Sequence, residues 1–353
     1  MPADAMLAAL NMEMTPMVPR TEYSAAAHWP LIERVTGIRI DQDSTDEERR
    51  RASCAFMRAW HYAMQWNTDI YKDIFNGQCT DMGHAVYNAD GSDYNAHITQ
   101  LFDDPEDVYD YDLFEAHGTP DVAAIVRRFD EKLAWQQSVF PEECLCMNGV
   151  YVTCISGVLE LLGWDTLLMA AGLDPKAFGA FIDRYCRWIG YYFEALAKCK
   201  SPVVMVHDDF VWGNGGFLAP AFYREFVFPN YKRLLAPLHE AGKKILFTAD
   251  GDYTEYIDDV AACGVNGFVM EPVTDMKYIA EKYGKTHVFV GNADTSILFR
   301  GSREDIYNEV KRCMDIGKRC PGFVMAVGNH IPANTPVENA LWYNECYEKM
   351  ARR

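Results

Sequence analysis

The chain has 353 residues, of which 49% are hydrophobic, so it is long and apolar enough to bury a large core. Its 33 basic and 51 acidic residues give a net charge of −18, which argues against nucleic acid or an anionic membrane as a partner and disfavours a polyanionic substrate. No apolar run reaches the length of a membrane span, the start lacks a secretion signal, and 11 scattered cysteines indicate reduced thiols, so we expect a cytoplasmic protein.

The first part of the chain predicts helices and loops. An amphipathic helix follows a capping residue at Ser44 or Thr45, because Ser and Thr bind the free N–H groups of a helix start. Residues 88–97 are rich in turn formers. We expect one domain over 1–353, in which residues 1–145 form a mainly helical extension packed on a barrel portion at 146–353.

From about residue 150 onward, short apolar runs alternate with amphipathic segments that end in glycine, as helices often do. Such runs are typical of parallel strands buried on both faces. The six runs are residues 150–157, 202–209, 244–252, 267–272, 287–294 and 322–331. With room for two more, they predict an α/β fold of the (β/α)8 TIM-barrel type. The alternative, a doubly wound open sheet, normally has a glycine-rich phosphate loop after its first strand, and the glycines at 213–216 have neither that spacing nor that position.

Polar side chains end five of these six runs. Because barrel strands carry reactive groups at their carboxyl ends, these side chains are candidates for a common site. In chain order they are His207, Asp208, Asp209, Asp250, Asp252, Glu271, Asn292, Asp294, Asn329 and His330. Asp252 and Asp294 precede helices and are more simply explained as N-caps. Glu271 precedes a proline and has no such explanation.

Two carboxylates and a histidine that converge from neighbouring strands can hold a divalent ion with an open position. We expect Asp250, Glu271 and His330 to bind such an ion, expected to be zinc, or otherwise to form a proton relay. These three residues and His207 are the predicted catalytic group, with Asp209 in reserve. A metal without thiolate ligands suits the polarisation of an oxygen leaving group.

The motifs "GNADTSIL" at 291–298 and "VGNHIPANTPVENA" at 327–340 resemble the uroporphyrinogen decarboxylase superfamily. The resemblance runs from about residue 150 to the end of the sequence, with a weaker likeness at 18–37. It implies the same barrel fold.

The resemblance leaves two branches to compare. Decarboxylases of the superfamily carry an arginine-rich start that grips propionates, whereas this chain offers only Arg20 in "VPRTEY". Methyltransferases that act on coenzyme M bind zinc through one histidine and two cysteines, and the matching positions here are Phe247, Ala249 and Asn329. Because both of these patterns are absent, the sequence resembles the third group, the substrate-side methyltransferases of corrinoid-dependent O-demethylation.

The resemblance therefore implies an enzyme that moves a methyl group from a small methylated substrate, expected to be an aromatic methyl ether, to the cobalt(I) of a separate corrinoid-binding protein. No cobalt-ligating Asp-x-His-x-x-Gly loop occurs in this chain, so a partner should carry the corrinoid. The expected substrate-binding residues are Arg20, Tyr23, Asp209, Asn292 and Asn329. The alternatives are a decarboxylase acting on a smaller cyclic carboxylate, and a non-catalytic barrel that binds a tetrapyrrole.

Overall fold

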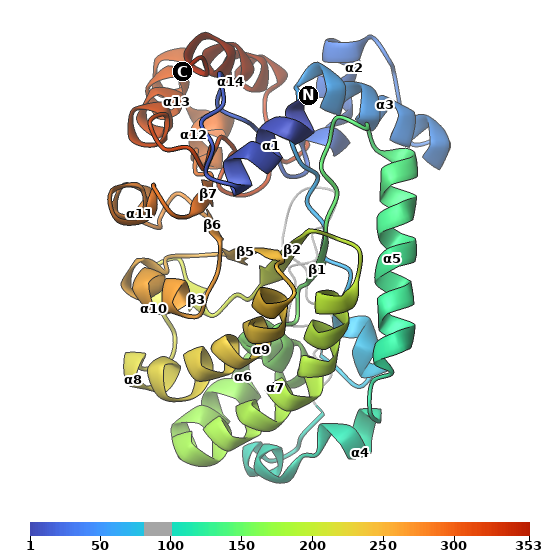
Figure 1. Ribbon diagram of the computed structural model, residues 1–353, viewed down its shortest axis with the longest axis vertical. Helices are drawn as coiled ribbons and strands as arrows, with labels where there is room; N and C mark the ends of the chain where they lie inside the picture. The colour runs from blue at the N-terminus through green and yellow to red at the C-terminus, as the bar shows by residue number, and fades with distance from the viewer. Residues whose placement is uncertain (81–100) are drawn as a thin grey trace.

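The computed structural model describes residues 1–80 and 101–353, and the predicted turn-rich segment at 88–97 lies outside the described residues. Its centre is a parallel sheet in the order β1-β2-β5-β6-β7-β8 (Figure 1). The strands are β1 (Asn148–Val150), β2 (Val203–His207), β5 (Lys244–Ala249), β6 (Gly267–Met270), β7 (Val288–Val290) and β8 (Phe323–Val324). A separate antiparallel hairpin is formed by β3 (Val211–Trp212) and β4 (Gly215–Gly216).

Two short segments near the start of the chain close this sheet into a barrel. Arg20 forms parallel bridges with Met325, just beyond β8, and with Tyr62 on its other side. Met64 then pairs in parallel with Leu145, which leads into β1. The predicted (β/α)8 barrel is confirmed, with one correction: two of its eight strand positions come from residues that the sequence assigned to the helical extension.

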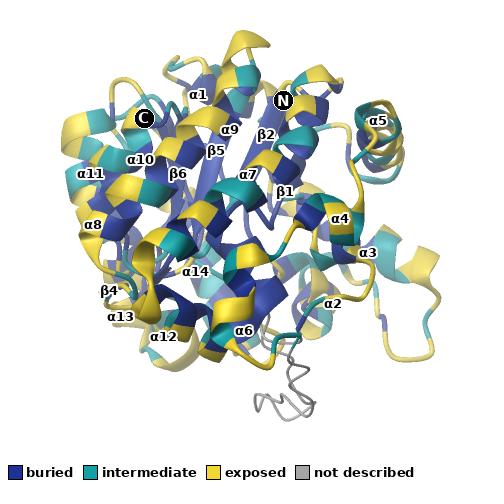
Figure 2. Cartoon of the chain, turned by 90° about the horizontal axis from the view of Figure 1, so that it is seen from below, coloured by how far each residue is buried: buried dark blue, intermediate teal, exposed yellow. Residues whose placement is uncertain are grey.

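Helices surround the strands, with their outer faces exposed and their inner faces buried (Figure 2). In the first part of the chain they are α1 (Pro2–Leu10), α2 (Trp29–Thr36), α3 (Asp46–Ala59), α4 (Leu113–His117) and α5 (Val122–Val139). In the second part they are α6 (Ile155–Leu173), α7 (Pro175–Lys198), α8 (Pro220–Phe222), α9 (Phe228–Glu240), α10 (Ile257–Ala262), α11 (Met276–Tyr283), α12 (Thr295–Arg300), α13 (Arg303–Gly317) and α14 (Val337–Met350).

Local sequence signals explain several of these boundaries. Thr45 is the N-cap of α3, and it forms a capping box with Glu48, as predicted. The first apolar run was predicted as a strand over 150–157, but β1 ends at Val150 and α6 begins at Ile155. A buried strand and a buried helix start have the same apolar composition, so the run alone did not distinguish them.

Helix α6 is long and apolar enough to cross a membrane by length and composition, which corrects the expectation that no segment is. Its most apolar window is 72% buried inside the protein. Helices in the core of a globular protein meet the same criteria, because they are covered by protein on all sides. We therefore describe α6 as a core helix.

Packed side chains fill the interior of the barrel. The inward residues of successive strands include Met205, Leu246, Val269, Val290 and Val324. Helix α1 adds Met6, Ala9 and Leu10 to the same cluster. As in other barrels of this type, the interior is a core rather than a pore.

Candidate active site

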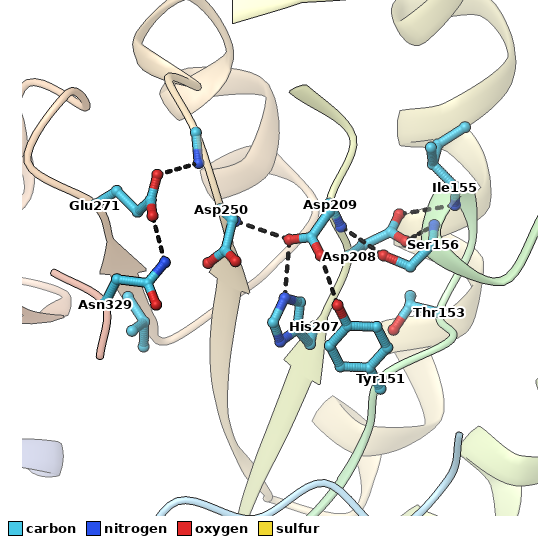
Figure 3. Close-up of polar contacts among 12 residues, drawn as sticks. Tyr151, Thr153, Ile155, Ser156, His207, Asp208, Asp209, Asp250, Glu271 and Asn329 are labelled. Atoms are coloured by element: carbon cyan, nitrogen blue, oxygen red, sulfur yellow. Dashed lines mark hydrogen bonds and ion pairs between the residues drawn. The ribbon is translucent and has the colours of Figure 1, made fainter. Parts of the chain in front are cut away.

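The alternation of side chains along a strand determines which polar residues reach the centre of the barrel. His207, Thr248 and Val269 are register partners on β2, β5 and β6 and share one inward layer. Two residues further along each strand stand Asp209, Asp250 and Glu271. The same alternation points these three carboxylates toward the axis, and Figure 3 shows them side by side.

Asp208 has the opposite orientation to Asp209. It is fully buried, and its carboxylate accepts hydrogen bonds from the N–H groups of Cys154 (3.1 Å), Ile155 (3.0 Å) and Ser156 (2.7 Å). These groups form the start of α6, so Asp208 caps a helix that follows the neighbouring strand. Its role is structural.

Asp209 is the most heavily hydrogen-bonded of the three carboxylates. Its Oδ1 accepts from His207 Nε2 and from the backbone N–H of Asp250, both at 2.8 Å, and its Oδ2 accepts from the Tyr151 hydroxyl at 2.8 Å. Its own N–H donates to Ser156 Oγ at 2.6 Å. The ring of Tyr151 lies against that of His207, with 4.2 Å between centroids. These contacts fix both side chains.

His207 and Asp209 stabilise each other as an ion pair. Burial acts to raise the pKa of Asp209, but the charge and hydrogen bond of His207 outweigh it, and the pKa lies below its usual value. Burial acts to lower the pKa of His207, but the adjacent Asp209 raises it above its usual value. Both shifts favour the ionised form of the pair.

Asp250 differs from Asp209 because few groups stabilise its charge. Burial among protein groups raises its pKa to about 7, helped by the negative charges of Asp209 and Glu271, while His207 and Asn329 act in the opposite direction. Its carboxyl group is open to the pocket. Asp250 therefore holds a proton near neutral pH at a place that a substrate can reach.

Glu271 is held by two hydrogen bonds. Its Oε2 accepts from the N–H of Gly251 at 2.8 Å and its Oε1 from Asn329 Nδ2 at 2.5 Å. Asn329, predicted to bind substrate, thus lies at the site and orients this carboxylate (Figure 3).

The carboxylates form one side of a pocket with a volume of about 280 Å³. The pocket is lined by Tyr151, Ser156, Leu159, Trp164, Asp209, Val211, Trp212, Gly213, Asp250, Gly251 and Glu271. No arginine or lysine is among these residues. The lining thus combines acidic and aromatic side chains.

The structure places His330 differently from the prediction. Its side chain is exposed, and its ring meets that of Tyr23 edge to face at 5.8 Å. Burial lowers its pKa, although Glu271 acts to raise it. Tyr23 in turn stacks on Trp66 at 4.6 Å. His330 lies in the loop beyond β8 and Gly328, and a Cβ at Gly328 would stand 2.4 Å from Cδ of Pro272.

Two predicted substrate-binding residues lie away from the pocket. The Arg20 side chain is fully buried, pairs with Glu22 at 2.7 Å and lies 4.5 Å from the ring centroid of Tyr347. Asn292 is also fully buried; its Nδ2 donates to the carbonyl oxygens of Glu271 and Thr274, at 3.1 and 3.2 Å. Both positions hold the barrel wall together.

The described residues suggest a different metal group from the predicted one. Ligand atoms of His207, Asp209 and Asp250 lie within 4.8 Å of one another. One imidazole and two carboxylates beside an open pocket are a donor set that zinc uses. However, His207 Nε2 and both oxygens of Asp209 already take part in hydrogen bonds, which an ion would have to replace. The zinc site predicted at Asp250, Glu271 and His330 stays a prediction. It is the alternative to a proton on Asp250, because a carboxylate that binds a metal is ionised.

The sequence did not single out Tyr151, Ser156, Trp164 or Trp212, all of which line the pocket. Tyr151 and Ser156 follow β1, whose carboxyl end was placed too late in the chain. A strand ending at Val150 would have marked both as candidates. Trp164 comes from the middle of a helix, and Trp212 lies beyond the strand end, so no strand-end rule would find them.

The fold and this pocket define a (β/α)8-barrel protein with a site over the carboxyl ends of its strands. Residues 158–350 match the family model for uroporphyrinogen decarboxylase (URO-D), and the chain belongs to that family.

Curated relatives and a solved structure agree with this assignment. Uroporphyrinogen decarboxylases from Syntrophotalea carbinolica and Geobacter metallireducens are 27% identical over 178 residues and 24% identical over 190 residues. The matches cover 50% of this chain and of the first relative, and 54% of this chain and of the second, so the chain spans about half the length of the curated relatives it matches. A methyltransferase from Methanosarcina mazei has the same fold, with a TM-score of 0.65 and 16% identity over 99% of this chain and 98% of that one.

Proposed function

We propose that this protein is a methyltransferase that moves a methyl group from a small methyl ether to the cobalt(I) of a corrinoid. The donor in this proposal is an aromatic methyl ether, and a separate protein carries the corrinoid. The observation that supports this most directly is Asp250, a pocket-facing carboxyl group whose pKa of about 7 keeps it partly protonated at neutral pH. An ether oxygen is a poor leaving group unless a proton donor neutralises the charge that develops on it.

In the proposed reaction, the acceptor cobalt supplies the electron pair of the new bond to the methyl carbon. The electron pair of the breaking C–O bond passes to the ether oxygen, and the Asp250 proton converts that oxygen into a hydroxyl group. Asp209 and Glu271 raise the proton affinity of Asp250 before the reaction, and His207 forms a hydrogen bond with Asp209. Tyr151 and Ser156 hold Asp209 in place.

The pocket argues against the decarboxylase alternative. A porphyrinogen with several carboxylates needs cationic partners, and the lining residues include neither arginine nor lysine. Arg20, the one arginine of the N-terminal motif, is buried against Glu22. A volume of about 280 Å³ also lies at the small end of ligand pockets, which suits a single ring better than a tetrapyrrole.

A purely binding role also fits poorly. Three carboxylates on adjacent strands repel one another, and a protein that only bound a tetrapyrrole would have no use for that arrangement. We propose that the corrinoid-binding partner docks over the barrel mouth, where the pocket opens, and that the isolated chain holds no cobalt.

The test supplies reduced free cobalamin in place of the partner and a series of methoxybenzenes as donors. We expect methylcobalamin and the matching phenol to form in equal amounts, followed by absorbance and chromatography. Carbon dioxide release from a cyclic carboxylate, without methyl transfer from any donor, would instead establish the decarboxylase.

A further inference from the structure

An aromatic cluster contributes two tryptophans, Trp164 and Trp212, to the pocket that the carboxylates also line; we call this cluster the aromatic wall. The ring centroids of Trp164 and Trp212 are 5.5 Å apart, and Phe217 lies 5.0 Å from the first and 5.4 Å from the second. Trp164 comes from α6 and Trp212 from β3, and both line the pocket. Trp212 is 45% exposed and lines the pocket, so its side chain is accessible to a ligand there.

The hairpin that carries Trp212 is fixed to the loop that carries Asp250. The carbonyl oxygen of Trp212 accepts a hydrogen bond from the N–H of Asp252 at 2.8 Å. Gly251, with φ +96°, lies so close that a Cβ there would stand 2.6 Å from the same oxygen. The aromatic wall therefore keeps a constant position relative to the acidic side.

We propose that this wall, with Trp212 as its exposed residue, and the three carboxylates of the same pocket select aromatic methyl ethers that carry no anionic group, and favour those that carry an ammonium group. This inference rests on the proposed function in taking the ligand to be a methyl ether. The selection by ring and charge concerns binding alone.

Two physical effects support the proposal. Tryptophan rings stack on planar ligands and attract cations through their π faces. Asp209 and Glu271 repel an anionic ligand in a pocket whose described lining residues include no arginine or lysine. His207 offsets one of these charges, and its imidazole is already paired with Asp209.

The experiment measures binding of three compounds of nearly equal shape to the full chain by calorimetry at pH 8, with no corrinoid present. These are 4-methoxybenzylamine, 4-methoxybenzyl alcohol and 4-methoxybenzoate. We expect the amine to bind most tightly and the benzoate at least about tenfold more weakly than the alcohol. Equal affinities, or tightest binding of the benzoate, would overturn the proposal.

Two variants test the wall and the charge separately. Trp212→Leu should weaken binding of the amine and the alcohol about three- to tenfold. Trp135→Leu is the matched control, because Trp135 is similarly exposed, at 48%, but lies on α5 outside the pocket lining. Glu271→Gln should reduce the ratio of amine to benzoate affinity. Unchanged binding by the Trp212 variant would show that the aromatic wall does not contribute to ligand binding.

These measurements separate the two proposals. If the binding order holds but no methyl group reaches cobalamin, the proposed function fails and the ligand class stands. If methyl transfer occurs while methoxybenzoates bind best, the function stands and this inference fails.

Discussion

Asp250→Asn tests the central chemical argument, because it preserves the shape of the side chain and removes its acidic proton. In the wild type, methyl transfer should be constant below about pH 7 and fall about tenfold for each further pH unit, as Asp250 loses its proton. In the variant, the rate should be about 10²- to 10⁴-fold lower and should lose this pH dependence.

The separation of the charges gives the size of the effect on Asp250. Ligand oxygens of Asp209 and Asp250 lie within 4.8 Å. Two unit charges at that distance repel by about 3 kcal/mol at an effective dielectric constant of about 20, which corresponds to about two pKa units. This is an upper value, since Asp250 is open to the pocket and water screens it. Burial is the larger cause of the rise to about 7, and the repulsion adds to it.

The same repulsion predicts that the variant is more stable than the wild type in alkali. The folded pKa of Asp250 lies above its ordinary value of 3.8, so the folded chain binds this proton more tightly than the unfolded chain. That contribution to stability is complete below about pH 4 and is lost as the pH rises through about 7. At pH 8, Asp250→Asn should therefore melt about 2 °C higher, equivalent to about 1 kcal/mol after screening.

The assay follows methylcobalamin formation from pH 5.5 to 9, with thermal unfolding of both proteins at pH 5 and pH 8. Lost activity together with unchanged or higher stability would exclude misfolding as the cause. A variant with the wild-type rate, or a wild-type rate that increases above pH 7, would refute the assignment of Asp250 as the proton donor.

Three further predictions concern neighbouring residues. Glu271→Gln removes one of the charges that raise the pKa of Asp250, so the falling limb of the pH–rate profile should move to lower pH; a limb that stays in place would show that Glu271 does not act on Asp250. Arg20→Met should lower the free energy of unfolding, measured in urea, by about 3–5 kcal/mol, because it leaves the buried Glu22 without its cationic partner. The KM should not change. A stable variant with a raised KM would support Arg20 as a substrate ligand. If the chain binds zinc, elemental analysis should find the metal lost in His207→Ala and retained in His330→Ala, and the reverse pattern would support the ligands first predicted from the sequence.

The barrel could be predicted from the sequence because its later strands are long apolar runs separated by helices with glycine ends. The first two strand positions could not be predicted from the sequence, because Arg20 and the residues Tyr62 to Met64 form only isolated bridges. Segments of this length have no periodicity to detect. They are defined by neighbours distant in the sequence, Met325 and Leu145.

The candidate site was predicted in outline. Side chains alternate between the two faces of a strand, and this rule could have been applied to the sequence alone. Continued from the apolar residues of β2, the alternation separates the inward Asp209 from the outward Asp208. The same alternation places Asn292 inward, which is wrong, because its amide bonds to the carbonyl oxygens of Glu271 and Thr274 instead. Hydrogen-bond partners from other segments decide such cases, and no local pattern records them.

The adjacent residues Asp208 and Asp209 serve different parts of the molecule, since Asp208 caps a helix and Asp209 lines the pocket. Asp208 secures the start of α6, while Ser156 in that same turn receives the N–H of Asp209. Descendants of this protein that acquire new substrates should therefore vary in the hairpin, while position 208 stays fixed. Libraries built for directed evolution should leave Asp208 unaltered and concentrate diversity on Trp212 and Trp164, where replacement alters the ligand without loosening a helix.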